Sequence, residues 1–585
     1  MPAASSWSNR NGCAPYRHHV DAFWRGAGGE QRLGHRHAWG VESDPGASFT
    51  FATGDQRFII VGNLLELDPD VALRYSTAPI KLSVIATDSH GFHVTQALSF
   101  AVSALDLVEA RSVVAPGYNS GAPAGISGGR AAAPGSLVYS VGAITGTAGN
   151  DIVAVNDLLS GGDGEAAGPS TLFSPAPVGI GAHNTASAAD SSFALGVGSD
   201  NFTLSLAATG GHGGTGSQAS AGWAQQFSYG SGGLPGGFGG DGGHGEVDIT
   251  NITVKGSGSL DVSMTALAQG GAGGKGGDAT AAISPQNAFA GGPGGAGGAA
   301  TATMDHVAIA ASTATGTVTV ALSDIATAGQ GGQGGLGSTD SHGFTAASGA
   351  SGSGADAHAV LTNSTIATGG GADSVVIALQ AIQTGSGSSI SFTGNSVNLG
   401  NGDDMLSLRA EIDQGSAGHP VALDASDFAF TGNSFDGGQG IDTLDVTGLA
   451  VAGGLTIDVG NGLLYMGSDT AHASSIKGFE AFIAGANDHV VDGRGAQVYS
   501  GGASIEFFAL HGKDVITDHV AGEAIIFHGF GTTFNAGKLA ASTTAVADYL
   551  AADGNHYAGL LINTHDGGSV LLAGVSTLGS DILFI

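Results

Sequence analysis

Apolar and polar residues alternate along many short segments of the chain. Within residues 42–104 this period of two recurs in RFIIVGNLLELDP, KLSVIATDS and TQALSFAVS, with turn residues between the segments. It returns after residue 199 in NFTLSLAA, SLDVSMTALA and TVTVALSDIATA. Because a strand points successive side chains to opposite faces, the pattern predicts an all-β protein.

Residues 199–368 contain three copies of a unit of roughly 59 residues. Each copy runs through a strand, a glycine tract, a short apolar or aromatic tip, a second glycine tract and a second strand. We expect the strands to stack into a β-solenoid and the glycine tracts to project as arms, packed as extended threefold helices. In the alternative, the arms are disordered and the tips collapse onto the solenoid. The aromatic tip residues, which would suit contact with a receptor or a glycan, are Trp223, Phe227, Tyr229, Phe289 and Phe344.

A nine-residue pattern dominates the C-terminal part of the chain. GGQGIDTLD (437–445) matches the template G-G-x-G-x-D-x-U-x, in which U is a large apolar residue, at every position. LGNGDDMLS (399–407) and TGGGADSVV (368–376) lack only the first glycine, and residues 483–518 read as further copies. The first six residues predict a glycine turn with positive φ, and the last three predict a short strand.

These nonapeptides resemble the haemolysin-type, or RTX, calcium-binding repeats. The resemblance implies a parallel β-roll over 483–530, in which residues 18 apart stack, so that Asp488 would lie above Glu506. It also implies Ca²⁺ between neighbouring turns, since a hard cation prefers oxygen ligands. A glycine- and aspartate-rich surface loop is the alternative. The candidate metal ligands are Asp88, Asp151, Asp373, Gly400, Gly402, Asp404, Gly437, Gly438, Gly440, Asp442, Asn487, Asp488, Glu506 and Asp514.

The other segments differ in composition. Residues 1–36, with five arginines and the single cysteine, are expected to form a disordered tail. Residues 37–104 resemble a bacterial cadherin-like β-sandwich through LRYS and ATDSHG, although only Asp44 and Asp88 remain as possible calcium ligands. Residues 105–198 are interpreted as a linker with degenerate RTX-like turns, which include Asp151.

The C-terminal third is divided into three parts. Residues 369–482 are expected to form a β-solenoid with insertions, because Asp373, Asp404, Asp442 and Asp488 are unevenly spaced. Residues 531–585 are interpreted as a cap that also resembles a type I secretion region, ending in GVSTLGSDILFI. Within it we expect a short helix over 542–554 and a hairpin around THDGG.

Charge and composition narrow the possible partners. The formal net charge is −32 with only 11% charged residues, so the surface would repel nucleic acid and attract divalent cations. One cysteine excludes an intramolecular disulfide framework. The sequence contains no run of 18 apolar residues, so no transmembrane helix is expected. The N-terminus lacks the apolar core of a signal peptide. An extracellular location would therefore require export through the C-terminal region.

No catalytic constellation is found in the sequence, which lacks both HExxH and a P-loop motif. We expect a secreted calcium-binding protein that acts in adhesion or in a cell-surface or biofilm matrix. Its partners would be calcium and a cell-surface glycan or protein receptor, with peripheral association with the cell surface. A carbohydrate-active β-helix of the lyase or epimerase type, carried on RTX repeats, is the first alternative. A matrix protein without a specific partner is the second.

Overall fold

The computed structural model describes most of the chain after residue 134 and shorter parts before it. The described residues are 36–37, 49–61, 64–67, 80–88, 93–100, 106–114, 134–146, 149–167, 178–218, 235–280, 288–311, 316–414, 420–485, 487–492, 495–501, 504–507, 512–519, 523–528, 542–564, 567–579 and 581–584. The predicted tail up to residue 35, Asp44 and the tip residues Trp223, Phe227 and Tyr229 lie outside them.

The chain divides into two compact units, residues 1–107 with 145–153, and residues 108–144 with 154–585. In the first unit, two small antiparallel sheets have the orders β1-β4-β3 and β2-β5-β6. In β5, buried Leu82 and Val84 alternate with exposed neighbours, as the period of two predicts. The strands of these sheets are β1 (Arg36–His37), β2 (Phe49–Thr53), β3 (Phe58–Val61), β4 (Leu64–Leu67), β5 (Ile80–Asp88) and β6 (His93–Phe100).

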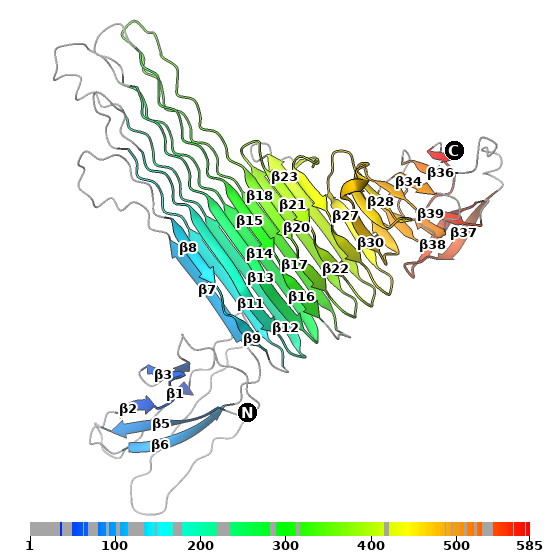
Figure 1. Ribbon diagram of the computed structural model, residues 1–585, viewed down its shortest axis with the longest axis horizontal. Helices are drawn as coiled ribbons and strands as arrows, with labels where there is room; N and C mark the ends of the chain where they lie inside the picture. The colour runs from blue at the N-terminus through cyan, green and yellow to red at the C-terminus, as the bar shows by residue number, and fades with distance from the viewer. Residues whose placement is uncertain are drawn as a thin grey trace, which may run out of the picture. The chain divides into compact units, whose positions relative to one another are not determined.

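The second unit is a solenoid of two mainly parallel sheets (Figure 1). The first sheet consists, in spatial order, of β7 (Asp106–Val114), β10 (Ile152–Ser160), β12 (Ser199–Thr209), β14 (Ser259–Gln269), β17 (Val318–Thr327), β20 (Ser374–Gln383), β23 (Met405–Gln414) with β24 (Pro420–Val421) beside it, β27 (Thr443–Leu449), β31 (Ala481–Ile483), β33 (Val498–Ser500), β35 (Lys513–Ile516), β39 (Ser569–Ala573), β38 (His556–Asn563) and β37 (Thr543–Leu550).

The second sheet packs against the first. Its strands are β8 (Gly135–Tyr139), β9 (Ala143–Thr145), β11 (Asn184–Ala194), β13 (Gly245–Gly256), β15 (Ala300–Asp305), β16 (Ala308–Ala311), β18 (Ala357–Thr362), β19 (Thr365–Ala367), β21 (Ser389–Thr393), β22 (Ser396–Asn398), β25 (Phe428–Thr431), β26 (Ser434–Asp436), β28 (Leu455–Asp458), β29 (Leu463–Met466), β30 (Ser474–Lys477), β32 (His489–Val491), β34 (Ser504–Phe507), β36 (Ile525–Phe527) and β40 (Ile582–Phe584). A 3-10 turn, η1 (Thr470–His472), follows β29.

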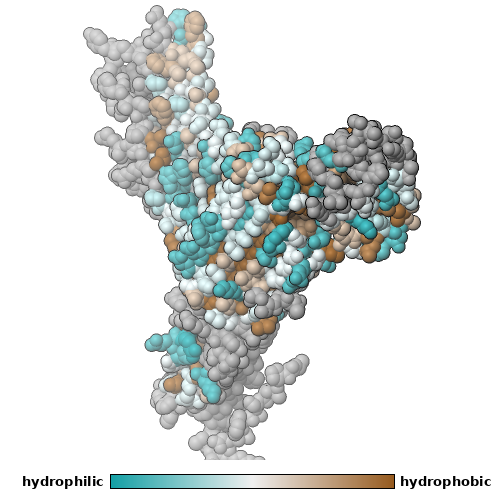
Figure 2. Space-filling view, turned by 45° about the vertical axis from the view of Figure 1, so that its right-hand side comes forward, coloured by the Kyte–Doolittle hydropathy of each residue, from teal (hydrophilic) through white to brown (hydrophobic). Residues whose placement is uncertain are grey.

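The core between the sheets is built from stacked apolar residues. In the first sheet Leu204 pairs with Met264, Met264 with Leu322, and Leu322 with Ile377, and all four are buried. Successive coils therefore repeat after 60, 58 and 55 residues, which confirms the predicted repeat. On the outer surface, hydrophilic and hydrophobic residues are interspersed (Figure 2), as expected where alternate residues of each strand point outward.

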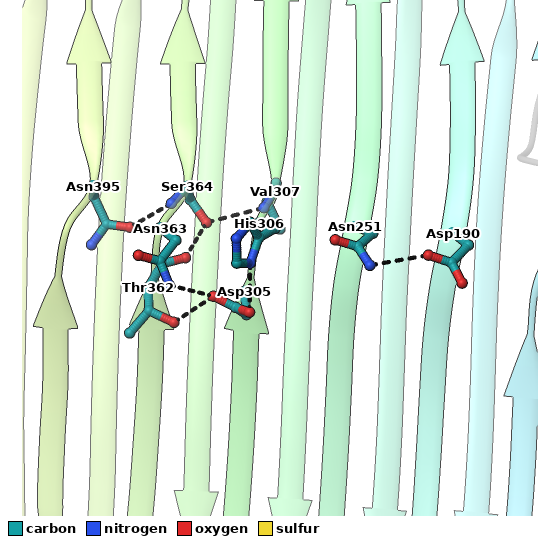
Figure 3. Close-up of polar contacts among 9 residues, drawn as sticks. All are labelled: Asp190, Asn251, Asp305, His306, Val307, Thr362, Asn363, Ser364 and Asn395. Carbon is teal, nitrogen blue, oxygen red and sulfur yellow. Dashed lines mark hydrogen bonds and ion pairs between the residues drawn. The ribbon is translucent and has the colours of Figure 1, made fainter.

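In four successive coils, one residue at the same position of the second sheet interrupts the regular strand conformation, and we call this position the bend (Figure 3). Asp190, Asn251, His306 and Asn363 occupy this position with φ between 51° and 54°, a region that non-glycine residues other than Asn, Asp and His seldom adopt. The Nδ2 atom of Asn251 donates to the Oδ1 atom of Asp190 at 3.0 Å. These polar side chains therefore connect neighbouring coils along the bend.

A row of buried polar residues follows the bend. The Asn395 Oδ1 atom accepts from the backbone N–H of Ser364 at 3.0 Å, and its Nδ2 atom donates to the carbonyl of Leu361 at 3.0 Å. Ser364 Oγ accepts from the N–H of Val307, and Asn433 Oδ1 accepts from the N–H of Asn395. Buried backbone groups that the bend releases from the sheet are thus satisfied by side chains.

Two sequence interpretations are wrong. The linker predicted over 105–198 is wrong, because its described residues contain the solenoid strands β7 to β11. The predicted helix over 542–554 is strand β37, which pairs antiparallel with β38. Its β-branched and aromatic residues favour a strand, and the edge of the sheet supplies its hydrogen-bond partners. The predicted hairpin around THDGG is confirmed as the β38–β39 pair.

Candidate functional site

Glycine-rich arms leave the solenoid between the two sheets (Figure 1). In each of four coils, an out arm follows a strand of the first sheet and a return arm leads into the second sheet. We call the set the arm bundle. The described parts of its out arms are 161–167, 210–218, 270–280 and 328–338, and those of its return arms are 178–183, 235–244, 288–299 and 346–356.

Backbone hydrogen bonds connect the arms in two directions. One set crosses between out and return arms, as where Gly243 N–H donates to Gly211 O at 2.7 Å and Gly271 N–H donates to Gly243 O at 2.8 Å. A second set runs between successive out arms, as where Gly213 N–H donates to Ala272 O at 2.9 Å. Return arms are connected in the same way, with Gly239 N–H donating to Pro293 O at 2.8 Å. Each inner arm is therefore held by neighbours in both rows.

The close approach of these arms requires glycine at two positions in three. A Cβ atom on Gly243 would lie 1.8 Å from the carbonyl oxygen of Ala182, and one on Gly274 would lie 1.9 Å from that of Gly214. The third position of each period points outward, as in exposed His212. The predicted extended glycine arms are thus confirmed in the described residues, and the tips of the first three arm pairs lie outside those residues.

Outward-pointing side chains satisfy backbone groups that the bundle leaves open. The Asp163 carboxylate accepts from the N–H of His212 at 2.9 Å, and His212 Nδ1 accepts from the N–H of Ala272 at 3.1 Å. Asp278 accepts from the N–H of Leu336 at 2.8 Å in the same manner. These contacts add side-chain links along the face of the bundle.

One tip can be followed in full. In the fourth arm pair, Thr339 and Thr345 form a bridge, and the Oδ1 atom of Asp340 accepts from the N–H groups of His342 and Phe344. The Phe344 side chain is 73% exposed at this end. Phe289, in the third pair, is half-buried and donates its N–H to Ser338 Oγ at 2.8 Å. The predicted aromatic exposure therefore holds for Phe344.

A second candidate site is the stack of three glycine–aspartate turns. Gly370 bridges to Asn401, and Asn401 bridges to Gln439, so the turns of residues 368–373, 399–404 and 437–442 lie in register. The positive φ predicted for these turns is found at Gly369, Gly371, Gly400, Gly402, Gly438 and Gly440. A Cβ on Gly402 would lie 1.6 Å from Gly371 O, so the turns also approach too closely for a side chain.

The three aspartates of this stack form a ladder. Asp404 Oδ1 accepts from the N–H of Asp373 at 2.7 Å, and Asp442 Oδ1 accepts from the N–H of Asp404 at 2.9 Å. Asp373 itself accepts from Val318 N–H at 2.7 Å, and Glu480 accepts from the N–H of Asp442 at 3.0 Å. Each carboxylate thus fixes the turn of the preceding coil.

The second oxygen of each ladder aspartate is buried without a hydrogen-bond partner among the described residues. Burial raises the pKa of Asp404 to about 6 and that of Asp442 to about 7, with repulsion from neighbouring carboxylates adding to it. Burial also raises the pKa of Asp373. At neutral pH these groups hold negative charge only at a cost in folding free energy.

The chemical type of these donors fits Ca²⁺, because carboxylate oxygens without a hydrogen-bond partner and the turn carbonyls are hard oxygen ligands. The ladder offers one aspartate from each turn, so several ligands of a cation would have to be backbone carbonyls such as those of Gly400, Gly402, Gly438 and Gly440. Within the described part of the chain, no group of three or more His, Cys, Asp or Glu side chains is arranged to hold a metal.

The remaining predicted ligands lie apart from the ladder. Asp488 is buried and accepts from the N–H groups of Leu455 and Gly485 at 2.8 and 2.7 Å, while neighbouring Asn487 is exposed. Glu506 lies in β34 opposite Val491, so its predicted stacking on Asp488 is wrong.

The coils in this region do not have a constant length of 18 residues. Phe482 pairs with Tyr499, 17 residues on, and Ile505 pairs with Ile525, 20 residues on. Turns of unequal length shift the sixth positions of the nonapeptides out of alignment.

Three predicted ligands occupy other places. Asp514 is buried in β35 and accepts from Gln497 N–H at 2.9 Å. Asp151 is buried immediately before β10, and Asp88 ends β5 in the first unit. Gly437 lies at the start of the third turn, where a Cβ would be 2.0 Å from Gly478 O.

Two parts of these sites were not predicted from the sequence. Glu480 extends the ladder, and its only signal is a spacing of 38 residues from Asp442, equal to that between Asp404 and Asp442. The first arm pair, 161–167 with 178–183, was also missed, although Gly161 and Gly164 in its out arm are three residues apart.

Comparisons with known proteins identify no family. No protein-family model matches the chain. No curated protein sequence matches it either. Among the residues that the structure describes, no helix is long and apolar enough to cross a membrane.

Proposed function

We propose that this protein is a secreted, calcium-binding protein of the RTX type that acts in adhesion or in a cell-surface matrix. The observation that carries the proposal is the arm bundle. Its arms extend from the solenoid and are joined by backbone hydrogen bonds, and the fourth arm pair holds its tip, residues 339–345, at the far end. A protein that presents loops on a stiff support is suited to contact another surface.

The tip residues supply the chemistry of that contact. Phe344 is exposed and is positioned by a turn that Asp340 fixes. An exposed aromatic side chain on a rigid turn loses little conformational entropy on binding, and it suits a glycan or a protein receptor. The acidic composition of the chain favours partners that are neutral, basic or bridged by divalent cations.

The ladder carboxylates Asp373, Asp404 and Asp442, with the turn carbonyls, are the groups proposed to hold calcium. A bound calcium ion would supply the positive charge that these buried carboxylates lack. The carboxylates themselves fix each turn to its neighbour through their Oδ1 atoms. Because metal binding stabilises only the folded chain, the solenoid would gain stability where calcium is abundant, outside the cell.

Attachment of the full chain to bacterial cells and to coated surfaces, with and without calcium, tests the proposal. We expect attachment in millimolar calcium and its loss in chelator, together with a reversible gain of β signal in circular dichroism. Attachment that is equal in calcium and chelator would contradict the calcium part. No attachment under either condition would contradict the adhesion part.

A further inference from the structure

A groove lies beside the C-terminal hairpin, away from the arm bundle. Strands β37 and β38 continue the first sheet beyond β39 (Figure 1). Side chains of the hairpin pack on the outer face of this sheet. Val498, Val515, Ala551 and Leu571 form the buried centre of this contact, and Val546 packs against it. The hairpin is therefore anchored, and the turn at its far end overhangs β27 and β31.

The groove between this turn and the sheet has a volume of about 380 Å³. This size lies within the range of small-ligand sites. The glycine–aspartate turns contribute Asp403, Asp404 and Ile441, the first sheet contributes Met405, Thr443, Ile483 and Ser500, with Thr517 directly after β35, and the hairpin contributes Asp553, Asn555 and Tyr557. Carboxylates and hydroxyls thus face a strip of apolar side chains across one opening.

Its polar groups are held in place before any ligand binds. Asp553 Oδ2 accepts from the phenol of Tyr557 at 2.6 Å and from Asn555 Nδ2 at 3.0 Å. Asp403 Oδ1 accepts from the N–H of Ile441 at 3.0 Å. Burial and the contact with Asp553 raise the pKa of Tyr557 to about 12, so its phenol remains a donor at neutral pH.

The lining restricts the chemistry of a ligand. Three aspartates line the groove, of which Asp404 is buried in the ladder while Asp403 and Asp553 are accessible, and no Lys or Arg is among its described lining residues. Such a site repels an acidic sugar and accepts hydrogen bonds from hydroxyl groups. The exposed Met405 side chain and the Tyr557 ring provide surface for the less polar face of a pyranose ring.

We propose that this groove binds a neutral oligosaccharide, with Asp403 and Asp553 accepting hydrogen bonds from adjacent hydroxyls. The inference rests on the proposed function in taking a cell-surface glycan as the partner, and it places a glycan site on the solenoid rather than at the arm tips. The groove would fix the orientation of the chain on a glycan-coated surface while the arms contact a second partner.

Affinity electrophoresis of the full chain in gels containing a neutral polysaccharide tests the inference. Dextran, mannan, galactan and a mixed-linkage β-glucan serve as neutral probes, with polygalacturonate and a chitosan oligosaccharide as acidic and cationic comparisons. We expect retardation by at least one neutral probe and at least a tenfold weaker affinity in D403A and in D553A. D261N, which changes an exposed aspartate on β14, is the matched control and should bind as the wild type does.

The two variants keep the inference testable if one of them disturbs the fold. Asp553 also accepts a hydrogen bond from the backbone N–H of Asn555, so its removal can disturb the turn. The affinity of D553A therefore counts as evidence only if its melting temperature matches that of D403A. No retardation by any neutral probe, unchanged affinity in D403A, or binding to the chitosan oligosaccharide alone would overturn the inference. Calcium-dependent attachment that persists in any of these cases would leave the proposed function standing, whereas its absence in the wild type would refute that function separately.

Discussion

Replacing Gly274 by alanine should open the arm bundle at its centre. The added Cβ would lie 1.9 Å from Gly214 O, whereas real Cβ atoms essentially never approach another atom within 3.0 Å. The arm must therefore move by more than 1 Å. Two hydrogen bonds are at risk, from Gly274 N–H to Gly240 O at 2.7 Å and from Gly295 N–H to Gly274 O at 2.9 Å. A shift of that size takes both beyond hydrogen-bonding distance.

The expected cost follows from these two bonds. Each contributes about 1 kcal/mol and its loss leaves one buried group unpaired at about 1–3 kcal/mol, so the local loss over the two bonds is about 4–8 kcal/mol. At about 1.4 kcal/mol per factor of ten, amide exchange in the arms should accelerate at least 100-fold. Hydrogen–deuterium exchange followed by mass spectrometry measures this change in the intact chain.

The matched control is Lys275→Ala, because residue 275 points outward next to Gly274 and is exposed. Its loss removes only a surface ion pair with Asp278, and exchange in the arms should stay near the wild-type rate. Protection of the arm amides that is equal in wild type, G274A and K275A would refute the interleaved bundle. Rapid exchange in the wild type itself would refute it as well.

Three further outcomes are expected. Asn395→Ala should lower the free energy of unfolding by about 2–5 kcal/mol in urea titration, since the Ser364 N–H and a facing carbonyl lose their partner; a loss below about 1 kcal/mol would contradict this. Without metal, stability should fall as pH rises from about 4 to about 7, because the folded-state pKa values of Asp404 and Asp442 lie above the unfolded value of 3.8. D442N should flatten this slope in chelator and weaken the response to calcium, and a slope unchanged by D442N would refute the assignment. Phe344→Ala should reduce surface attachment several-fold without changing the melting temperature, whereas unaltered attachment would remove the tip from the contact.

The sequence anticipates structure best where backbone geometry dictates residue type. Glycine at two positions in three predicts closely packed arms, because no side chain fits between backbone segments that lie so near to each other. Likewise, the turns at 399–404 and 437–442 are predicted because their glycines take positive φ, which other residues adopt only at a cost. Both signals are local, and both are confirmed.

The missed features depend on pairing between neighbouring coils or strands, which a local sequence pattern does not specify. Glu480 joins the ladder only because its coil stacks on that of Asp442, which no local pattern reveals. Glu506 misses Asp488 because turn lengths in this region vary, so a fixed period fails. Residues 543–550 become a strand through pairing with β38 at the edge of the sheet. In each case the pairing between strands or coils decides the outcome.

The interior of the arm bundle has a thermal consequence. It is filled by peptide groups rather than apolar side chains. Exposing apolar surface raises the heat capacity on unfolding, whereas exposing polar surface lowers it. The arms should therefore unfold with a small heat-capacity change and keep their order on cooling, where the hydrophobic core of the solenoid loses strength. Near freezing, the part of this molecule that holds together best should be the part without a hydrophobic core.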